Sequence, residues 1–282
     1  MTRGDARSEA TARLRAAGDP TAALDADLLL AHVCGIPKEE LYAHLDAPMG
    51  TAERSAYAAL VDRRASGEPV AYLRGHKEFF GLRLAVDRRV LIPRPETEVL
   101  VEAVLAFLRG TGRTSVADVG TGSGAIAVAV AVGEPRVHVV ATDVSADALD
   151  VARANVAAHG VAHRVELLQG DLLGPVAGTV DAVAANLPYL RPDAVEHLAG
   201  GRTSLAFEPQ VAVVAGPDGL DLIRRCIDQL PDRLAAGGAA FFECDPPQVD
   251  TVAALLRDRI RATTRVLRDL AGLARVVEGN RG

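Results

Sequence analysis

The sequence of 282 residues contains no tryptophan, few other aromatic residues and only three cysteines. Cys34, Cys226 and Cys244 lie far apart and form no Cys-x-x-Cys pair, which argues against a disulfide framework or a cysteine-based zinc site. No apolar run approaches the ~20 residues of a membrane-spanning helix, and the opening MTRGDARSEATARL lacks the apolar centre of a secretory signal. We therefore expect a reduced, cytoplasmic protein with no membrane partner.

An overall excess of positive charge is also absent, because 37 Asp and Glu outnumber 31 Lys and Arg. The net charge of −6 argues against a general nucleic-acid coat, and we expect no stable nucleic-acid partner. The charge balance reverses locally between Val61 and Arg94, where eight Lys or Arg stand against four acids. A solvated helix face and hairpin explain this segment, and a docking surface for an acidic or RNA-containing partner is the alternative.

The first part of the chain has the signals of short helices. Thr21 and Thr51 can each cap one, and glycine- or proline-containing stretches separate them. These signals predict a small helical domain at residues 1–75. Alternating β-formers around Gly81 then predict a bridging β-hairpin at residues 76–93.

Residues 94–282 alternate between strand and helix patterns. The expected strands are SVADV, VHVVATD, RVELLQGD, VDAVAAN and AAFFEC, followed by two closing strands. Such alternation predicts an α/β domain with a mostly parallel, doubly wound, seven-stranded sheet. Ligands bind sheets of this kind beyond the carboxyl ends of the strands.

The first strand ends in a glycine-rich turn, Gly120-Thr121-Gly122-Ser123-Gly124. Its third glycine comes four positions after the first, whereas a dinucleotide fingerprint needs five, and no P-loop lysine follows. A nicotinamide-dependent dehydrogenase is therefore disfavoured. The pattern resembles that of S-adenosylmethionine-dependent methyltransferases, in which the glycines make room for the methionine part of the cofactor. A purely structural glycine turn is the alternative.

Two acidic residues follow the next two strands. Asp143 closes VHVVATD, where a carboxylate can accept both ribose hydroxyls of a nucleoside. Asp171, in LLQGDLL, is placed to accept from an adenine amino group, with Leu172 packing on the ring. An Asp after a Gly is also a common turn, but polar groups at successive strand ends indicate a site when taken together.

The fourth strand ends in Asn186-Leu187-Pro188-Tyr189. Asn and Pro form turns, so a turn is the simple interpretation. The alternative is a clamp for a planar nitrogen, in which the Asn186 side-chain oxygen accepts one N–H and the Leu187 carbonyl, held by Pro188, accepts the other. Tyr189 would cover the planar group and exclude water. Methyl transfer to such a nitrogen depends mostly on positioning and electrostatics.

From GEPVAYLRGHKEFFGLRLAVDRRVLIPRPETEVLVE onward, the sequence resembles the release-factor glutamine methyltransferases, and DVGTGSGAIA, ATDVSADALDVARAN and FEPQVAVVAGPDGLD match as well. The resemblance implies a Rossmann-like S-adenosylmethionine-dependent domain behind a helical substrate-recognition domain. It implies methyl transfer to the Gln of the Gly-Gly-Gln loop in class I peptide chain release factors. By the same resemblance, the glycine turn, Asp143, Leu172 and Asn186 line the cofactor, and Asn186 to Tyr189 hold the substrate glutamine, with Asn186, Pro188 and Tyr189 as catalytic residues.

The sequence departs from the family pattern in three places. Leu187 replaces the first Pro of the usual Asn-Pro-Pro-Tyr, Leu172 stands where Trp is common, and Cys-Asp-Pro-Pro follows Glu243 in place of a glycine-containing turn. We interpret the last as structural, and Arg94 and Glu96 as a structural ion pair or cap.

Other functions remain open at this stage. Asn-Leu-Pro-Tyr also resembles the motif of ribosomal-RNA adenine dimethylating enzymes, so an adenine-N6 methyltransferase is the main alternative. A non-catalytic, cofactor-dependent binding module is the second. His159 and His163 are separated by Gly160 and lack a Glu partner, so no metal site is expected. We expect a monomer, although the sequence leaves the oligomeric state open.

Overall fold

The computed structural model describes residues 1–194 and 204–282. The chain divides into two compact units: one comprises Met1–His76 and a later segment that ends at Phe207, and the other contains the rest of the described chain from Lys77 to Gly282. Within the described residues, no helix is both long enough and apolar enough to cross a membrane.

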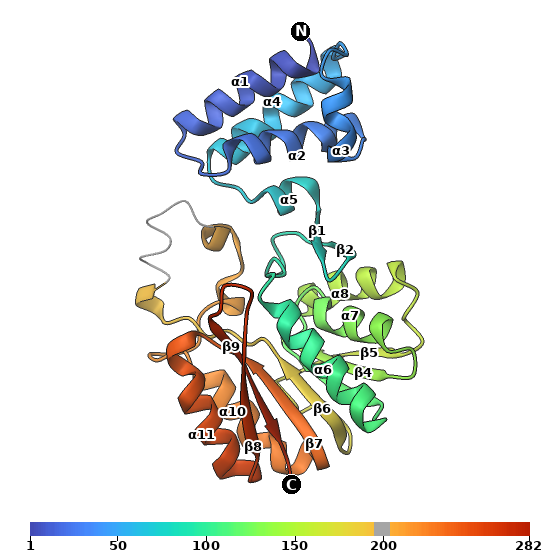
Figure 1. Ribbon diagram of the computed structural model, residues 1–282, viewed down its shortest axis with the longest axis vertical. Helices are drawn as coiled ribbons and strands as arrows, with labels where there is room; N and C mark the ends of the chain where they lie inside the picture. The colour runs from blue at the N-terminus through green and yellow to red at the C-terminus, as the bar shows by residue number, and fades with distance from the viewer. Residues whose placement is uncertain (195–203) are drawn as a thin grey trace. The chain divides into compact units, whose positions relative to one another are not determined.

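The first unit is helical, as predicted (Figure 1). Its elements are α1 (Arg3–Ala16), α2 (Ala22–Cys34), α3 (Lys38–Leu41), η1 (Tyr42–His44), α4 (Thr51–Ala65), α5 (Val70–Arg74) and the later η2 (Ser204–Phe207). Leu14, Leu29, Leu30 and Leu41 are fully buried in its core. The sequence interpretation missed α1, two of whose four buried residues are alanine and whose N-cap, Thr2, forms a capping box with Asp5.

The predicted caps differ in detail. The Thr21 hydroxyl bonds Asp19 and Asp25 and makes no capping hydrogen bond. Gly50 occupies the N-cap position of α4, so Thr51 is already the first helical residue. Several cations of the basic segment form ion pairs: Arg63 with Glu68, Arg64 with Asp19 and Asp25, Arg89 with Asp87, and Arg94 with Glu208.

The second unit opens with a two-stranded sheet of β1 (His76–Phe79) and β2 (Leu82–Ala85) and contains a seven-stranded sheet, ordered β5-β4-β3-β6-β7-β9-β8. The strands are β3 (Ser115–Val119), β4 (His138–Asp143), β5 (Val165–Gln169), β6 (Val180–Ala185), β7 (Leu234–Glu243), β8 (Thr263–Arg268) and β9 (Ala274–Asn280). Only β9 runs antiparallel to its neighbours β7 and β8. The predicted mostly parallel, seven-stranded sheet and the hairpin are confirmed.

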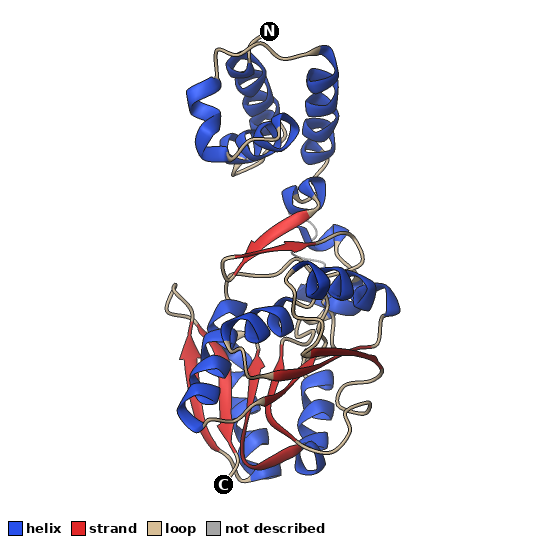
Figure 2. Cartoon of the chain, turned by 90° about the vertical axis from the view of Figure 1, so that its right-hand side faces the viewer, coloured by secondary structure: helices blue, strands red, loops and turns tan. Residues whose placement is uncertain are grey.

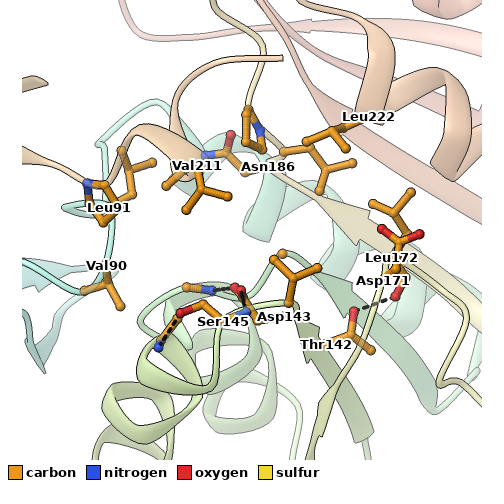
Figure 3. Close-up of a pocket in the computed structure, with 18 of the residues that line it drawn as sticks. Val90, Leu91, Thr142, Asp143, Ser145, Asp171, Leu172, Asn186, Val211 and Leu222 are labelled. Atoms are coloured by element: carbon orange, nitrogen blue, oxygen red, sulfur yellow. Dashed lines mark hydrogen bonds between the residues drawn. The ribbon is translucent and has the colours of Figure 1, made fainter. Parts of the chain in front are cut away.

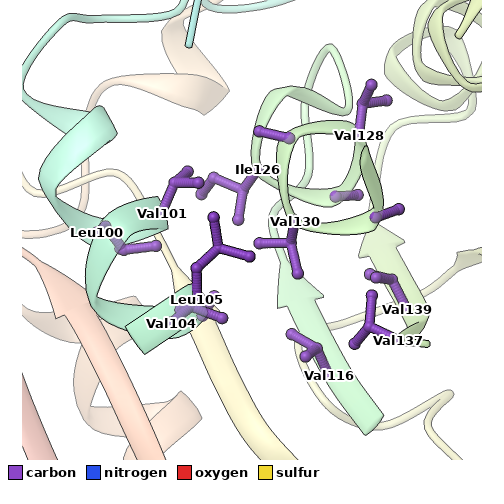
Figure 4. Close-up of a cluster of buried hydrophobic side chains, with 14 of the residues drawn as sticks. Leu100, Val101, Val104, Leu105, Val116, Ile126, Val128, Val130, Val137 and Val139 are labelled. Carbon is purple, nitrogen blue, oxygen red and sulfur yellow. The ribbon is translucent and has the colours of Figure 1, made fainter. Parts of the chain in front are cut away.

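Helices cover both faces of the seven-stranded sheet (Figures 1 and 2). The helices are α6 (Thr97–Thr111), α7 (Ala125–Gly133) and α8 (Ala146–Ala158) on one face, and α10 (Asp221–Arg233) and α11 (Val249–Ile260) on the other, with η3 (Gln210–Ala212) and η4 (Pro246–Gln248) in loops. Side chains of β6 alternate between the two cores, since Ala182 and Ala184 pack with α6 and α7 whereas Val183 and Ala185 pack with α10 and α11. Figure 4 shows the first core, built from branched aliphatic side chains.

The register between β3 and β6 is fixed at their amino ends. Asp181 accepts hydrogen bonds from the Ser115 hydroxyl (2.7 Å), the backbone N–H groups of Ser115 (3.1 Å) and Thr114 (3.2 Å), and the Arg113 guanidinium (2.6 Å). The two strands then pair from Val116 opposite Ala182 to Val119 opposite Ala185. They therefore end level with each other, one in the glycine turn and the other in Asn186.

Candidate active site

Four loops at the carboxyl ends of parallel strands meet around one cavity of about 270 Å³ (Figure 3). Gly120 follows β3, Asp143 ends β4, Asp171 follows β5 and Asn186 follows β6, and all four line the cavity. Gly122, Leu172, Leu187 and Pro188 line it too, so most of the predicted site residues come together. The sequence interpretation missed mainly apolar wall residues, which no motif separates from core residues: Val90, Leu91, Val144, Ala148, Val211 and Leu222.

The glycine turn needs its glycines for backbone reasons. Gly120, Gly122 and Gly124 have φ angles of 73°, 55° and 80°, a region that disfavours residues with a Cβ. A Cβ on Gly124 would lie 3.2 Å from the Cβ of Ala152 in α8. Gly124, Thr121 and Ser123 are not among the residues that line the cavity. Instead, they shape the turn that presents Gly120 and Gly122.

The interior of that turn is held by a buried acid, Asp118. Its Oδ2 accepts from the Thr121 hydroxyl (2.6 Å) and from the Ala127 N–H (3.0 Å). Burial raises the pKa of Asp118 to about 7, although the two hydrogen bonds act to lower it. The Oδ1 atom has no hydrogen-bond partner among the described residues. The acid in front of the glycines therefore orders the start of α7.

Asp143 is oriented by backbone hydrogen bonds before any ligand binds. Its Oδ2 accepts from the Gly122 N–H and its Oδ1 from the Ser145 N–H, both at 2.9 Å. Each carboxylate oxygen has a further lone pair to offer the cavity. The side chain is thus fixed in place to accept two hydroxyl groups.

The third strand end is partly exposed to solvent. The Asp171 carboxylate lies 2.5 Å from the Arg225 guanidinium, and both side chains are about half exposed, at 52% and 53%. Leu172 is buried and adopts a φ of 52°, which is unusual for a residue with a side chain. Its carbonyl accepts from the Thr142 hydroxyl at 2.8 Å (Figure 3). This arrangement turns the Leu172 side chain into the cavity wall.

Asn186 and Leu187 present two hydrogen-bond acceptors side by side. The Asn186 Nδ2 donates to the Thr97 hydroxyl at 2.9 Å. Within the part of the chain that the structure describes, neither the Asn186 Oδ1 nor the Leu187 carbonyl oxygen receives a hydrogen bond. Because both residues line the cavity, the pair of acceptors can take the two N–H bonds of a planar amine.

Tyr189 does not line this cavity, unlike its three predecessors. Its hydroxyl lies 3.4 Å from Glu243 Oε1, and burial raises the pKa of Tyr189 far above its ordinary value, so the phenol stays neutral. Its backbone is braced instead. The Tyr189 carbonyl accepts from Gln248 Nε2 at 3.0 Å, and a Cβ on Gly219 would lie only 2.1 Å from that same oxygen.

Arg94 forms the structural ion pair that the sequence predicts. It lies 2.6 Å from Glu208, whose side chain is fully buried and also accepts from the Ile92 N–H at 3.2 Å. Glu96 occupies the N-cap position of α6 without a capping hydrogen bond, so the cap interpretation is wrong. The Arg94–Glu208 pair ties the segment after Val90 and Leu91 to the segment before Val211, both of which line the cavity.

The chemistry of the cavity fits S-adenosylmethionine. Val144, Ala148, Leu172, Leu187 and Leu222 offer apolar walls to an adenine ring, and Asp143 offers a carboxylate to a ribose diol. A Cβ on Gly120 would lie 2.9 Å from Leu187 Cδ2, so the glycine keeps the space between the first and fourth loops open. The cofactor also carries no phosphate, which agrees with the missing P-loop lysine.

Comparison with known proteins finds methyltransferases at the level of family model and fold. A methyltransferase small domain model matches residues 95–202. A methyltransferase from Pyrococcus furiosus has the same fold, with a TM-score of 0.52 and 17% identity over 81% of this chain and 99% of that one. The hMettl16 catalytic domain, solved with an RNA hairpin, gives a TM-score of 0.56 and 16% identity over 82% of each chain. Together with the relatives described next, these matches make the protein an S-adenosylmethionine-dependent methyltransferase.

The relatives define the family. The PrmC N-terminal domain model matches residues 5–75. A release factor glutamine methyltransferase from Moorella thermoacetica is 42% identical over 91% of this chain and 90% of its own length. Another, from Deinococcus radiodurans, is 38% identical over 98% of both chains. The chain belongs to the release factor glutamine methyltransferase family.

Proposed function

We propose that this protein transfers a methyl group from S-adenosylmethionine to the side-chain amide nitrogen of the Gln in the Gly-Gly-Gln loop of class I peptide chain release factors. Family membership supports the choice of substrate. The observation that carries the chemistry is the pair of unused acceptors, the Asn186 Oδ1 and the Leu187 carbonyl oxygen, at the cavity edge. A primary amide has two N–H bonds, which match these two acceptors.

The residues of the clamp act by orientation. An amide nitrogen is a poor nucleophile because its lone pair is delocalised into the carbonyl group. Hydrogen bonds from both N–H groups to Asn186 and Leu187 hold the nitrogen towards the cavity and favour localisation of that lone pair. Pro188 restricts the backbone around the Leu187 carbonyl. The cofactor supplies the electrophilic methyl group when bound, with the glycine turn, Asp143, Asp171, Leu172 and Asn186 as the residues that hold it.

No strong general base is needed, because the nitrogen loses its proton readily once it has been alkylated. Glu243 and Asp118 are buried acids that are not required as bases in this scheme. The partly buried Tyr189 side chain limits the access of water behind the clamp. The planar group is therefore handled by hydrogen-bond acceptors and exclusion of water alone.

We assign substrate recognition to the helical domain at residues 1–75 and the hairpin at 76–93, and chemistry to residues 94–282. We further propose that the enzyme works in the cytoplasm, where translation takes place, and that it acts as a monomer.

The test is mass spectrometry of an intact class I release factor and of a Gly-Gly-Gln loop peptide after incubation with enzyme and cofactor. We expect a gain of one methyl group on the Gln, faster in the intact factor than in the peptide. An unmodified Gln in both substrates would refute the proposal.

An adenine-N6 methyltransferase is kept as a second candidate because of Leu187. With this residue the clamp has the sequence Asn-Leu-Pro-Tyr, which also resembles the motif of ribosomal-RNA adenine dimethylating enzymes. Radiolabelled cofactor offered separately to release factor and to ribosomal RNA distinguishes the two. Label in the RNA alone would select the second candidate. Cofactor binding without transfer to either would instead select a non-catalytic binding module.

A further inference from the structure

The Asn155 side chain on α8 joins two elements that lie far apart in the sequence. Its Nδ2 donates to the Ser123 carbonyl of the glycine turn at 2.8 Å and to the Ala85 carbonyl on β2 at 3.0 Å. Its Oδ1 accepts from the Ala85 N–H at 2.7 Å. Asn155 is only 1% exposed, and it is not among the residues that line the cofactor cavity. The scheme proposed above gives this buried amide no direct task.

The position of Asn155 requires a side-chain amide. A backbone N–H only donates and a backbone carbonyl only accepts, so the three partners fix which end of the amide is oxygen and which is nitrogen. Both protons of Nδ2 are used, and Oδ1 has its donor, so the side chain is satisfied at full burial. An Asp would offer no donor when ionised, and a Leu of similar volume would offer neither donor nor acceptor.

Both elements that Asn155 joins need support from outside. The turn contains Gly120, Gly122 and Gly124, all with positive φ, and glycine loses more backbone entropy on ordering than any other residue. The β1–β2 hairpin is a two-stranded sheet, which is marginally stable in isolation. Asn155 gives a partner to both backbone groups of Ala85, as a third strand would. One side chain therefore helps to order both elements.

Both sides of this connection also reach the cavity. Gly122, next to Ser123, is part of its lining. On the other side, the chain that leaves β2 at Ala85 reaches the cavity wall at Val90 and Leu91. A ligand that orders one of two connected elements reduces the entropy that the other must still lose, so binding at the two elements becomes cooperative.

We propose that Asn155 is a positioning residue that couples cofactor binding at the glycine turn to the order of the β1–β2 hairpin. A turn that is already ordered costs less entropy on cofactor binding, and the hairpin becomes more rigid once the turn is occupied. The consequence for the partner rests on the proposed function, which assigns the hairpin to release-factor recognition. The product S-adenosylhomocysteine and release factor then increase each other's affinity by the same factor.

The first experiment measures the Kd of S-adenosylhomocysteine by calorimetry, without any substrate. Asn155→Leu removes all three hydrogen bonds at similar volume, and we expect its Kd to be about tenfold higher than that of the wild type. The matched control is Arg164→Ala, which removes hydrogen bonds to the Ala131 (2.7 Å) and Val137 (3.3 Å) carbonyls at the opposite edge of the sheet. Its Kd should stay within about twofold of the wild type. Equal Kd values for the two variants would overturn the positioning role.

The second experiment follows amide hydrogen exchange in the hairpin by NMR, with and without S-adenosylhomocysteine. The reporter is the Phe80 N–H, which donates to Glu98 at 2.8 Å and makes no contact with Asn155 of its own. We expect the product to slow this exchange at least about threefold in the wild type and in Arg164→Ala, but not in Asn155→Leu. Unchanged exchange in the wild type would refute the coupling, and this outcome is measurable even if Asn155→Leu does not fold.

The third experiment measures the affinity of labelled release factor for the enzyme by fluorescence anisotropy. We expect S-adenosylhomocysteine to tighten binding at least about threefold in the wild type and to have no effect in Asn155→Leu. An equal effect in both proteins would contradict the role of Asn155. If release factor is neither bound nor methylated by the wild type, the proposed function fails, whereas the Kd values and the exchange rates still decide the coupling.

Discussion

Gly219 offers a quantitative test of how the Asn186–Tyr189 loop is held. Its φ of 75° disfavours any Cβ, and a Cβ there would meet the Tyr189 carbonyl oxygen at 2.1 Å and Gln248 Nε2 at 2.7 Å. For Gly219→Ala, the left-handed backbone costs about 1–2 kcal/mol. Displacement of the contacted backbone costs a further ~1–3 kcal/mol. The Gln248 side chain cannot yield freely, because its Nε2 is bonded to the Tyr189 and Asp218 carbonyls.

Gly272→Ala is the matched control, since Gly272 has a φ of 78° and no atom within 4 Å of its would-be Cβ. It should show the backbone cost alone, about 1–2 kcal/mol in thermal unfolding, and retain full activity. Gly219→Ala should be the less stable of the two by ~1–3 kcal/mol and should lose about 100-fold in kcat, because a loop shift of roughly 1 Å misplaces both acceptors. Equal melting temperatures and equal rates for the two variants would show that the loop is not braced at Gly219.

Three further predictions follow from individual contacts. Asn186→Ala should lower kcat about 100-fold or more with only a modest change in cofactor Kd, measured by methyl-transfer assay and calorimetry. Full turnover in this variant would refute the role of Asn186 in the clamp. Arg94→Ala leaves the fully buried Glu208 unpaired and should cost about 3 kcal/mol in chemical unfolding, whereas Arg89→Ala, which breaks an exposed pair, should cost about 0–1 kcal/mol. The folded-state pKa of Asp118, raised by burial to about 7 from 3.8, means that the folded state binds more protons, so stability should fall as pH rises from about 4 to about 7. Asp118→Asn should flatten this decrease, and an unchanged slope would contradict the assignment.

Strand and helix periodicity was sufficient to predict the architecture of the second unit. The pattern of apolar strands bounded by turn residues gave the seven strands, because parallel strands buried on both faces carry near-continuous apolar runs. One rule predicted that four site residues would lie together, namely that the carboxyl ends of parallel strands meet at the same edge of the sheet. The residues are Gly120, Asp143, Asp171 and Asn186. Local pattern and global topology agree in these segments.

Contacts between distant side chains could not be predicted in the same way. Thr97 appears in the sequence only as part of IPRPETE, so nothing local indicates that its hydroxyl accepts a hydrogen bond from the Asn186 side chain. The two hydrogen bonds from Gln248 to the Tyr189 and Asp218 carbonyls likewise depend on how η4 lies against the Asn186–Tyr189 loop, which no local pattern indicates. The α1 helix was missed because its buried side holds two alanines and a threonine beside a single leucine, a pattern with little hydrophobic contrast.

The hydrogen bonds around Asp181 have a practical meaning for anyone who redesigns this enzyme. Asp181 lies at the far end of β6, about 17 Å of strand away from Asn186, yet it sets which residue of β3 stands opposite which residue of β6. A slip of one position would turn every β6 side chain to the other face and carry the clamp out of line with the glycine turn. Mutant libraries restricted to the cavity wall would never sample this determinant. Loops grafted from a relative should be exchanged together with the Ser115–Asp181 pair that aligns them.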